Sequence, residues 1–228
     1  LSSGRGDLEL TVEMMTELFA RSQTPKPLAF VNTVSNAACF YVAQLLGLHS
    51  RSNYVCNRYF AFESVLQLAA TDISLGHVSS ALVGSLDVAT HPLNEHRQRL
   101  QLSPGTVMGE GSHWLWLGKQ DASKPRLGEL LDARHFDNRD ALFAWCRSNE
   151  FNKPALSRGQ FVSDADWNEM TSRMPHLELF NYREQRAYYD SHSGAAIGEF
   201  LRGNSPAATL LHLNSDGGGR FSVMVVGR

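Results

Sequence analysis

Apolar residues along the chain follow periodicities that predict a layered arrangement of strands and helices. Over residues 60–75 they cover most of a helical circumference, from Phe62 to Ile73, which predicts a helix buried on nearly all sides. The segments on either side, 52–56 and 79–88, are short apolar runs typical of strands. A strand, a helix and a second strand in this order indicate an α/β layered fold, with a mixed sheet and a buried central helix.

The remaining chain divides into further elements by the same criteria. Apolar residues recur at helical spacing over 8–21, which predicts an amphipathic helix, whereas the short apolar run at 28–32 is expected to be extended. Two apolar runs around the turn sequence "SDGGG" predict a closing hairpin. Residues 120–158 show little regularity apart from one helix. The other predicted elements are helices over 33–47, 139–149, 163–174 and 194–201, strands over 110–119 and 176–180, and hairpin strands over 208–214 and 220–228.

Composition and charge are those of a globular protein without a nucleic-acid or membrane surface. The chain has 228 residues, of which 43% are hydrophobic and 19% charged, and its net charge is −2 with a pI near 6.5. No apolar run reaches about 18 residues and no signal peptide stands at the start, so neither a membrane nor a nucleic-acid partner is expected. The first residue is Leu1 and not Met, which suggests a trimmed chain in which the strands before the first helix are missing.

Cysteine and histidine patterns give no sign of a disulfide framework or a metal centre. Cys39, Cys56 and Cys146 are scattered and odd in number, with no CxxC pair, which is typical of a reducing, cytoplasmic compartment. His91 and His96 lie five residues apart in a proline-containing segment, which is a weak metal-binding pattern. We therefore expect no metal and no other cofactor.

Four segments, in order along the chain, resemble the β-ketoacyl synthases, a family with the thiolase-type fold. They are "PLAFVNTVSNAACFYVAQLLGL", "SNYVCNRYFAFESVLQLAATDISLGHVSSALVGSLDV", "PGTVMGEGSHWLWLG" and "LLHLNSDGGGRFSVMVVGR". The match over 28–118 has consistent spacing, while residues 120–190 contain no matching segment. The resemblance implies one reduced ketosynthase-like domain over 1–228, with an N-terminal half at 1–118 and a shortened C-terminal half at 119–228.

The resemblance also implies where the catalytic nucleophile would lie. In active synthases the cysteine precedes a small residue of the buried helix by ten positions; that small residue corresponds to Ala69, so Tyr59 occupies the nucleophile position. Cys56 lies three residues earlier, on the predicted strand. A phenol, with a pKa of about 10, is a poor acyl carrier compared with a thiol at a helix N-terminus. The family's "HGT" motif is absent, and "SHSGAAIG" leaves His192 as the candidate for the second family histidine.

The resemblance thus implies a non-catalytic subunit of the chain length factor type. Such a subunit pairs with an active ketosynthase in fatty-acid, polyketide or aryl-polyene biosynthesis, meets acyl carrier protein only indirectly, and shapes the tunnel for the growing chain. We place the partner interface at 52–56 and 78–88, where an apolar strand edge would be exposed in a lone subunit. The residues expected to narrow or gate the tunnel are Tyr59, Phe60, Phe62, Gly217, Gly218 and Gly219.

Other interpretations of the same residues stay open. Cys56 as a displaced nucleophile would make the chain an acyl-transferring or hydrolysing enzyme, although a strand cysteine is usually an inert small hydrophobe. Tyr59 is equally compatible with simple filling of a degenerate cavity, and His192 with an ordinary helix-cap or surface histidine. The glycines of "SDGGG" are equally those of a turn. The whole chain is also compatible with a homodimeric binding protein that has no pathway partner.

Overall fold

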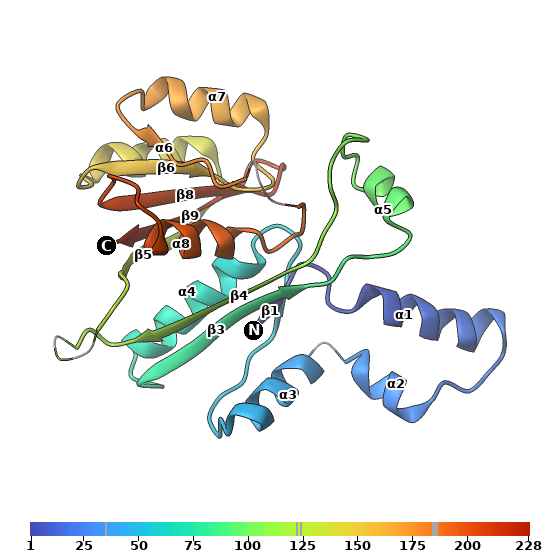
Figure 1. The fold of residues 1–228 in the computed structure, drawn as a ribbon. Coiled ribbons are helices and arrows are strands. Elements are labelled where there is room, and N and C mark those ends of the chain that lie inside the picture. The colour runs from blue at the N-terminus through green and yellow to red at the C-terminus, as the bar shows by residue number, and fades with distance from the viewer. Residues whose placement is uncertain (35, 122, 124, 184–186) are drawn as a thin grey trace.

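The chain forms two separate β-sheets with helices between and outside them (Figure 1). The structure is a computed structural model, and it describes residues 1–34, 36–121, 123, 125–183 and 187–228. The strands are β1 (Ser2–Ser3), β2 (Val55–Cys56), β3 (Ser80–Asp87), β4 (Gly111–Gly118), β5 (Glu129–Phe136), β6 (Pro154–Arg158), β7 (Glu178–Leu179), β8 (Thr209–Ser215) and β9 (Phe221–Gly227). The helices are α1 (Leu8–Met15), the π-helical η1 (Thr16–Ala20), α2 (Pro27–Asn32), α3 (Ala37–Leu46), α4 (Ala61–Ser74), α5 (Leu93–Arg99), α6 (Arg139–Ser148), α7 (Asp164–Arg173) and α8 (Ser193–Arg202).

The first sheet has the strand order β2-β1-β3-β4. β1 pairs in parallel with β2 and β3, and β4 pairs antiparallel with β3 from Ser80 opposite Gly118 to Asp87 opposite Gly111. One strand, β1, precedes the first helix and lies inside the sheet, although the sequence predicted none there. β3 pairs with β4 along its whole length, whereas β1 pairs with it only at Ser85. Among the described residues, no strand lies beside residues 80–84 on the β1 side, so the partner interface over 78–88 stays a prediction.

The second sheet has the order β5-β9-β8-β6-β7 and contains the predicted hairpin of β8 and β9. Side chains of β9 alternate between two apolar clusters, with Val223 and Val225 on one face and Met224 and Val226 on the other. This period of two is what a strand buried on both faces requires. β5 and β6 lie in the segment that showed little regularity in the sequence, so both were missed.

Helices α4 and α8 form a layer between the two sheets, while α6 and α7 cover the outer face of the second (Figure 1). Phe62 and Leu66 of α4 pack with Val83 of the first sheet and with Met224 of the second. The predicted central helix is thus confirmed. Leu68 is 37% exposed, so the burial of the helix is less complete than expected. One apolar core joins the two halves of the chain.

Helices α1 to α3 extend away from the layered body (Figure 1). The run at 28–32 is helical and not extended, because Pro27 occupies the first turn of α2, where its fixed φ favours a helix. The predicted helix over 8–21 is present as α1 and η1. Its apolar stripe is not covered, since Val12, Met15 and Phe19 are 54%, 53% and 70% exposed. Across the described residues, we find no helix of the length and apolarity needed to span a bilayer.

Candidate functional site

The turn between β2 and α4 brings the candidate nucleophile position to the start of the buried helix. Asn57 accepts a hydrogen bond from the backbone N–H of Tyr59 (3.2 Å) with its side-chain oxygen, which closes the turn. Phe60 is the N-cap residue of α4, so Tyr59 directly precedes the helix N-terminus. Cys56 ends β2 and lies four residues before the cap.

Tyr59 is half-buried in a small aromatic cluster. Its ring meets the ring of Phe161 edge-on at 5.1 Å, and the Arg58 guanidinium lies 5.1 Å from its centroid. Phe161 in turn contacts Tyr188 at 6.2 Å between centroids. The side chain that precedes α4 is therefore held by residues of the C-terminal half, from the segments after β6 and before α8.

Asn214, at the end of β8, joins these segments through one buried amide. It is 1% exposed and donates to the carbonyl of Tyr59 (2.9 Å) and to Oε1 of Glu63 (2.8 Å). Its oxygen accepts the backbone N–H of Phe161 (3.3 Å). The Ser193 hydroxyl donates to the same Glu63 oxygen at 2.5 Å. Burial raises the pKa of Glu63, against the effect of these two hydrogen bonds.

Cys56 lies at the carboxyl ends of the parallel strands, near two buried carboxylates. Its thiol is exposed, yet its pKa is raised by partial burial, then by the charges of Asp87 and Asp190. Asp87 accepts hydrogen bonds from the Ser3 hydroxyl (2.9 Å) and from the backbone N–H of Ser191 (2.6 Å). A nucleophilic cysteine needs a lowered pKa, so this environment opposes the catalytic interpretation of Cys56.

An ion pair between Arg5 and Asp190 lies near Cys56, and its arginine also contacts one of the two histidines considered for metal binding. Arg5 donates to Asp190 (2.5 Å) and lies 2.5 Å from Nε2 of His96. Burial and then the Arg5 charge lower the pKa of His96 to about 4. His91 is exposed. Among the described residues, no group of three or more potential metal ligands is found.

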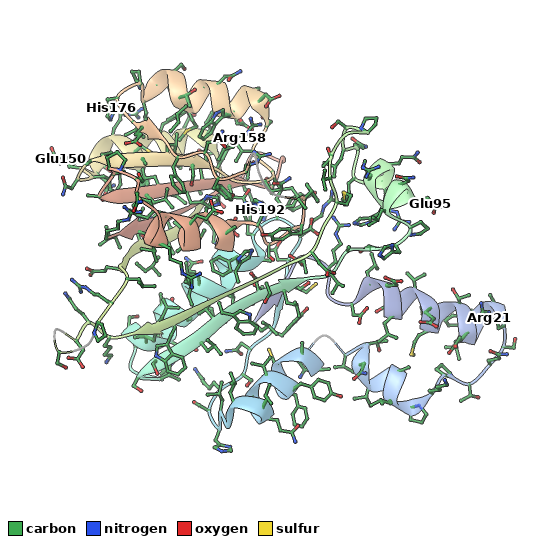
Figure 2. All side chains as sticks on the ribbon, viewed as in Figure 1. Arg21, Glu95, Glu150, Arg158, His176 and His192 are labelled. Carbon is green, nitrogen blue, oxygen red and sulfur yellow. The ribbon has the colours of Figure 1, made fainter. Side chains whose placement is uncertain are left out.

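His192 lies at the N-terminal end of α8 and is only 1% exposed (Figure 2). Its side chain makes no capping hydrogen bond; its ring packs against Tyr189 (4.7 Å) and Tyr182 (5.1 Å) instead. His192 is the N-cap residue of α8, so the helix-cap interpretation is confirmed for its position but not for its side chain, and the surface interpretation is wrong. A sequence motif made His192 a candidate site residue, and the structure places it in the interior, in contact with two tyrosines.

One further buried histidine was not singled out from the sequence. His212 on β8 is fully buried, and its Nδ1 lies 2.9 Å from the hydroxyl of Ser157 on the neighbouring strand. Among the described residues its Nε2 has no hydrogen-bond partner. Burial, followed by the charges of His192 and Arg183, lowers the pKa of His212 to about 3. In the sequence it stands within an apolar strand run, which carries no signal of this pairing.

The proposed tunnel residues other than Tyr59 fall into three environments. Phe60 is 6% exposed and its ring lies 5.2 Å from that of His135. Phe62 is fully buried in the apolar core between the sheets. Gly217 and Gly219 have φ of +70° and +98°, and their turn is closed by Asp216, which accepts the backbone N–H groups of Gly218 (2.8 Å) and Arg220 (3.0 Å).

Comparison with known proteins shows structural likeness and little sequence likeness. The sequence matches no protein-family model and no curated protein at a significant level. In structure the chain is similar to the ishigamide ketosynthase/chain length factor, with a TM-score of 0.80 and 15% identity over 99% of this chain and 71% of that chain.

Two further structures are similar along nearly the whole chain. One is a type II polyketide synthase acyl-carrier protein in complex with its ketosynthase bound to the hexaketide (TM-score 0.70, 14% identity, 99% of this chain and 74% of that chain). The other is a β-ketoacyl synthase from Burkholderia phymatum (TM-score 0.64, 16% identity, 99% and 74%). The chain is therefore a thiolase-fold protein whose structure resembles the β-ketoacyl synthases, including a ketosynthase/chain length factor.

Proposed function

We propose that this chain is a non-catalytic ketosynthase-like subunit of the chain length factor type, which pairs with an active β-ketoacyl synthase in polyketide or related acyl-chain biosynthesis. The observation that carries the proposal is the phenol of Tyr59 immediately before the N-terminus of the central helix α4. In an active synthase a thiol stands at that position. The two halves, 1–118 and 119–228, act as one domain, since α4 packs against strands of both.

The side chains at the N-terminus of α4 favour a non-catalytic role for this chain. Carbon–carbon bond formation on an acyl chain needs a thiolate that carries the chain and leaves easily. Tyr59 cannot supply a thioester, and its ring occupies space between Arg58 and Phe161. Cys56 has a raised pKa and lies on the strand. The chain therefore shapes the chamber of a partner synthase, and it meets acyl carrier protein only through that partner.

An apolar surface on the outlying helices suits such a partner. A monomeric protein seldom exposes a large continuous apolar area. Leu45 on α3 is 85% exposed, and β2, next to these helices in the sequence, is an edge strand of the first sheet. We therefore place the partner interface on α1 to α3 and the β2 edge. The exposed large apolar residues of these helices are Val12, Met15, Leu18, Phe19, Leu28, Phe30, Val31, Phe40, Tyr41, Leu45 and Leu46.

Co-expression with a ketosynthase encoded beside this chain tests the proposal. Size-exclusion chromatography with light scattering should show a one-to-one complex. Leu45→Asp should remove the complex, because a charge would be buried in an apolar contact. Leu127→Asp is the matched control, since Leu127 is 64% exposed but lies outside these helices. A stable monomer that binds no synthase would overturn the proposal, and a homodimer unaffected by the synthase would favour a partner-free binding protein.

The acyl-transferring alternative has its own test. Intact mass is measured after incubation with acyl-thioesters, for the natural chain and for Cys56→Ser. We expect no adduct, because the raised pKa leaves little thiolate on Cys56. An adduct that disappears in Cys56→Ser would establish Cys56 as an acyl carrier and would displace the proposal above.

A further inference from the structure

A cavity of about 560 Å³ opens at the carboxyl ends of β6 and β7, lined by residues of the C-terminal half and by residues 105–107 of the N-terminal half. Arg158, which ends β6, and Arg183 contribute two guanidinium groups to its wall (Figure 2 labels Arg158). Trp167 and Tyr188 contribute aromatic surface. None of the residues that line the cavity in the described part of the chain is Asp or Glu. The lining thus combines positive charge with aromatic walls.

Arg183 is the less satisfied of the two arginines. Its side chain is largely withdrawn from water, and it donates to the carbonyl of Gly159 at 3.2 Å. That bond uses one of its five N–H donors. Within the described residues no carboxylate forms an ion pair with Arg183. Burial lowers the pKa of this guanidinium, which reflects the cost of holding its charge there.

Arg158 is held in place by its own chain. It donates to the carbonyl of Val162 (2.7 Å from Nη2) and to the carboxylate of Asp164 (2.6 Å), and it lies 5.9 Å from the centroid of Trp167. The Asp164 side chain is 87% exposed, so it balances Arg158 at the rim and does not enter the cavity. One carboxylate at the rim faces two guanidinium groups, which leaves a net positive charge.

We infer that this cavity binds a small organic anion, in which a carboxylate or phosphate is attached to an aromatic or other apolar body. The oxyanion contacts the guanidinium of Arg183, whose planar fork fits two oxygens of such a group. The apolar body packs against Trp167 and Tyr188. A volume of about 560 Å³ lies within the range of small-molecule sites. Tyr188 also contacts Phe161, which contacts Tyr59, so an occupied cavity adjoins the candidate site.

Three probes that share a phenyl ring test this inference: benzoate, phenyl phosphate and benzamide. Each is titrated into the isolated chain by calorimetry and by tryptophan fluorescence. At least one of the two anions should bind saturably. The affinity for neutral benzamide should be lower by about tenfold or more. Comparison of the two anions identifies the preferred oxyanion. Trp167→Phe should remove the fluorescence change while calorimetric binding persists.

Variants of Arg183 decide whether this arginine is responsible. Arg183→Gln should weaken anion binding about tenfold, and Arg183→Lys should retain part of it because the charge is kept. Arg202→Gln, at an exposed position on α8, should bind as the natural chain does. Equal binding of benzamide and benzoate, a folded Arg183→Gln that binds normally, or no anion binding up to about 10 mM would each overturn the inference. The test uses no synthase, so its outcome and that of the partner proposal are independent.

Discussion

The side-chain amide of Asn214 donates a 2.9 Å hydrogen bond to the carbonyl of Tyr59, 155 residues earlier in the chain. The same amide donates to Glu63, in the first turn of α4. The start of the central helix is therefore held by the end of a strand in the other sheet. This connection makes the position of Tyr59 a property of the whole fold and not of its local turn.

Asn214→Ala should destabilise the protein strongly. The substitution leaves the carbonyl of Tyr59 and the backbone N–H of Phe161 without these partners in a buried region, at a cost of about 3 kcal/mol in the free energy of unfolding. Urea denaturation followed by circular dichroism measures the change. Asn204→Ala, at an exposed position, is the control and should alter stability by less than about 0.5 kcal/mol. Equal values for the two variants would contradict the role assigned to Asn214.

The free energy of unfolding should fall as pH rises, because Glu63 then loses its proton. Its pKa in the folded state is raised above the ordinary value of 4.5, so the folded state holds this proton more tightly than the unfolded state does. Its contribution is therefore present below pH 4.5 and is lost as pH increases through the raised folded pKa. Glu63→Gln cannot titrate, so the natural chain should lose stability relative to it over that window.

Urea unfolding of both proteins at several pH values from 4 upwards provides the comparison. Glu110→Gln, at an exposed side chain, serves as the control, and its profile should run parallel to that of the natural chain. A constant difference between Glu63→Gln and the natural chain across this range would show that Glu63 does not titrate as described.

Cys56 should react with alkylating reagents before the other cysteines, but slowly. Its thiol is exposed, whereas Cys39 is buried and burial raises the pKa of Cys146 to about 11. The charges of Asp87 and Asp190 add to the effect of burial on Cys56, so the midpoint of its rate against pH should lie above the ordinary value of 9.0. Iodoacetamide labelling read by peptide mass spectrometry gives this profile, with Cys56→Ser as the control. A midpoint below 9.0 would restore Cys56 as a candidate nucleophile.

Substitutions of Tyr59 and Phe62 should have different consequences, the first for the length of the products and the second for the stability of the protein. Tyr59 is half-buried, so Tyr59→Ala should leave the heterodimer intact and lengthen the products of the partner synthase by enlarging the chamber. Phe62 is fully buried in the core, so Phe62→Ala should cost about 3–5 kcal/mol of stability. Product length is read by mass spectrometry and stability by urea unfolding. An unchanged product distribution with Tyr59→Ala would assign this side chain to cavity filling.

The candidate site was only partly accessible to sequence reasoning. Counting along the buried helix drew attention to Tyr59, and a motif drew attention to His192. The partners of Tyr59 and Glu63 were not predicted, because Glu63 meets Ser193 across 130 positions and Asn214 across 151. Nor did any local pattern indicate that Arg158 and Arg183 would share one cavity.

Periodicity determined the elements whose burial repeats along the chain: α4 with its broad apolar surface, β3 and the β8–β9 hairpin. It did not determine β1, which is two residues long and is a strand only because β2 and β3 supply its hydrogen-bond partners. It also mistook α2 for an extended segment, since four consecutive apolar residues are too few to distinguish the two periods. Local patterns record which face of an element is buried. Only tertiary packing decides which distant polar groups meet between the sheets, since those contacts join residues with no spacing rule between them.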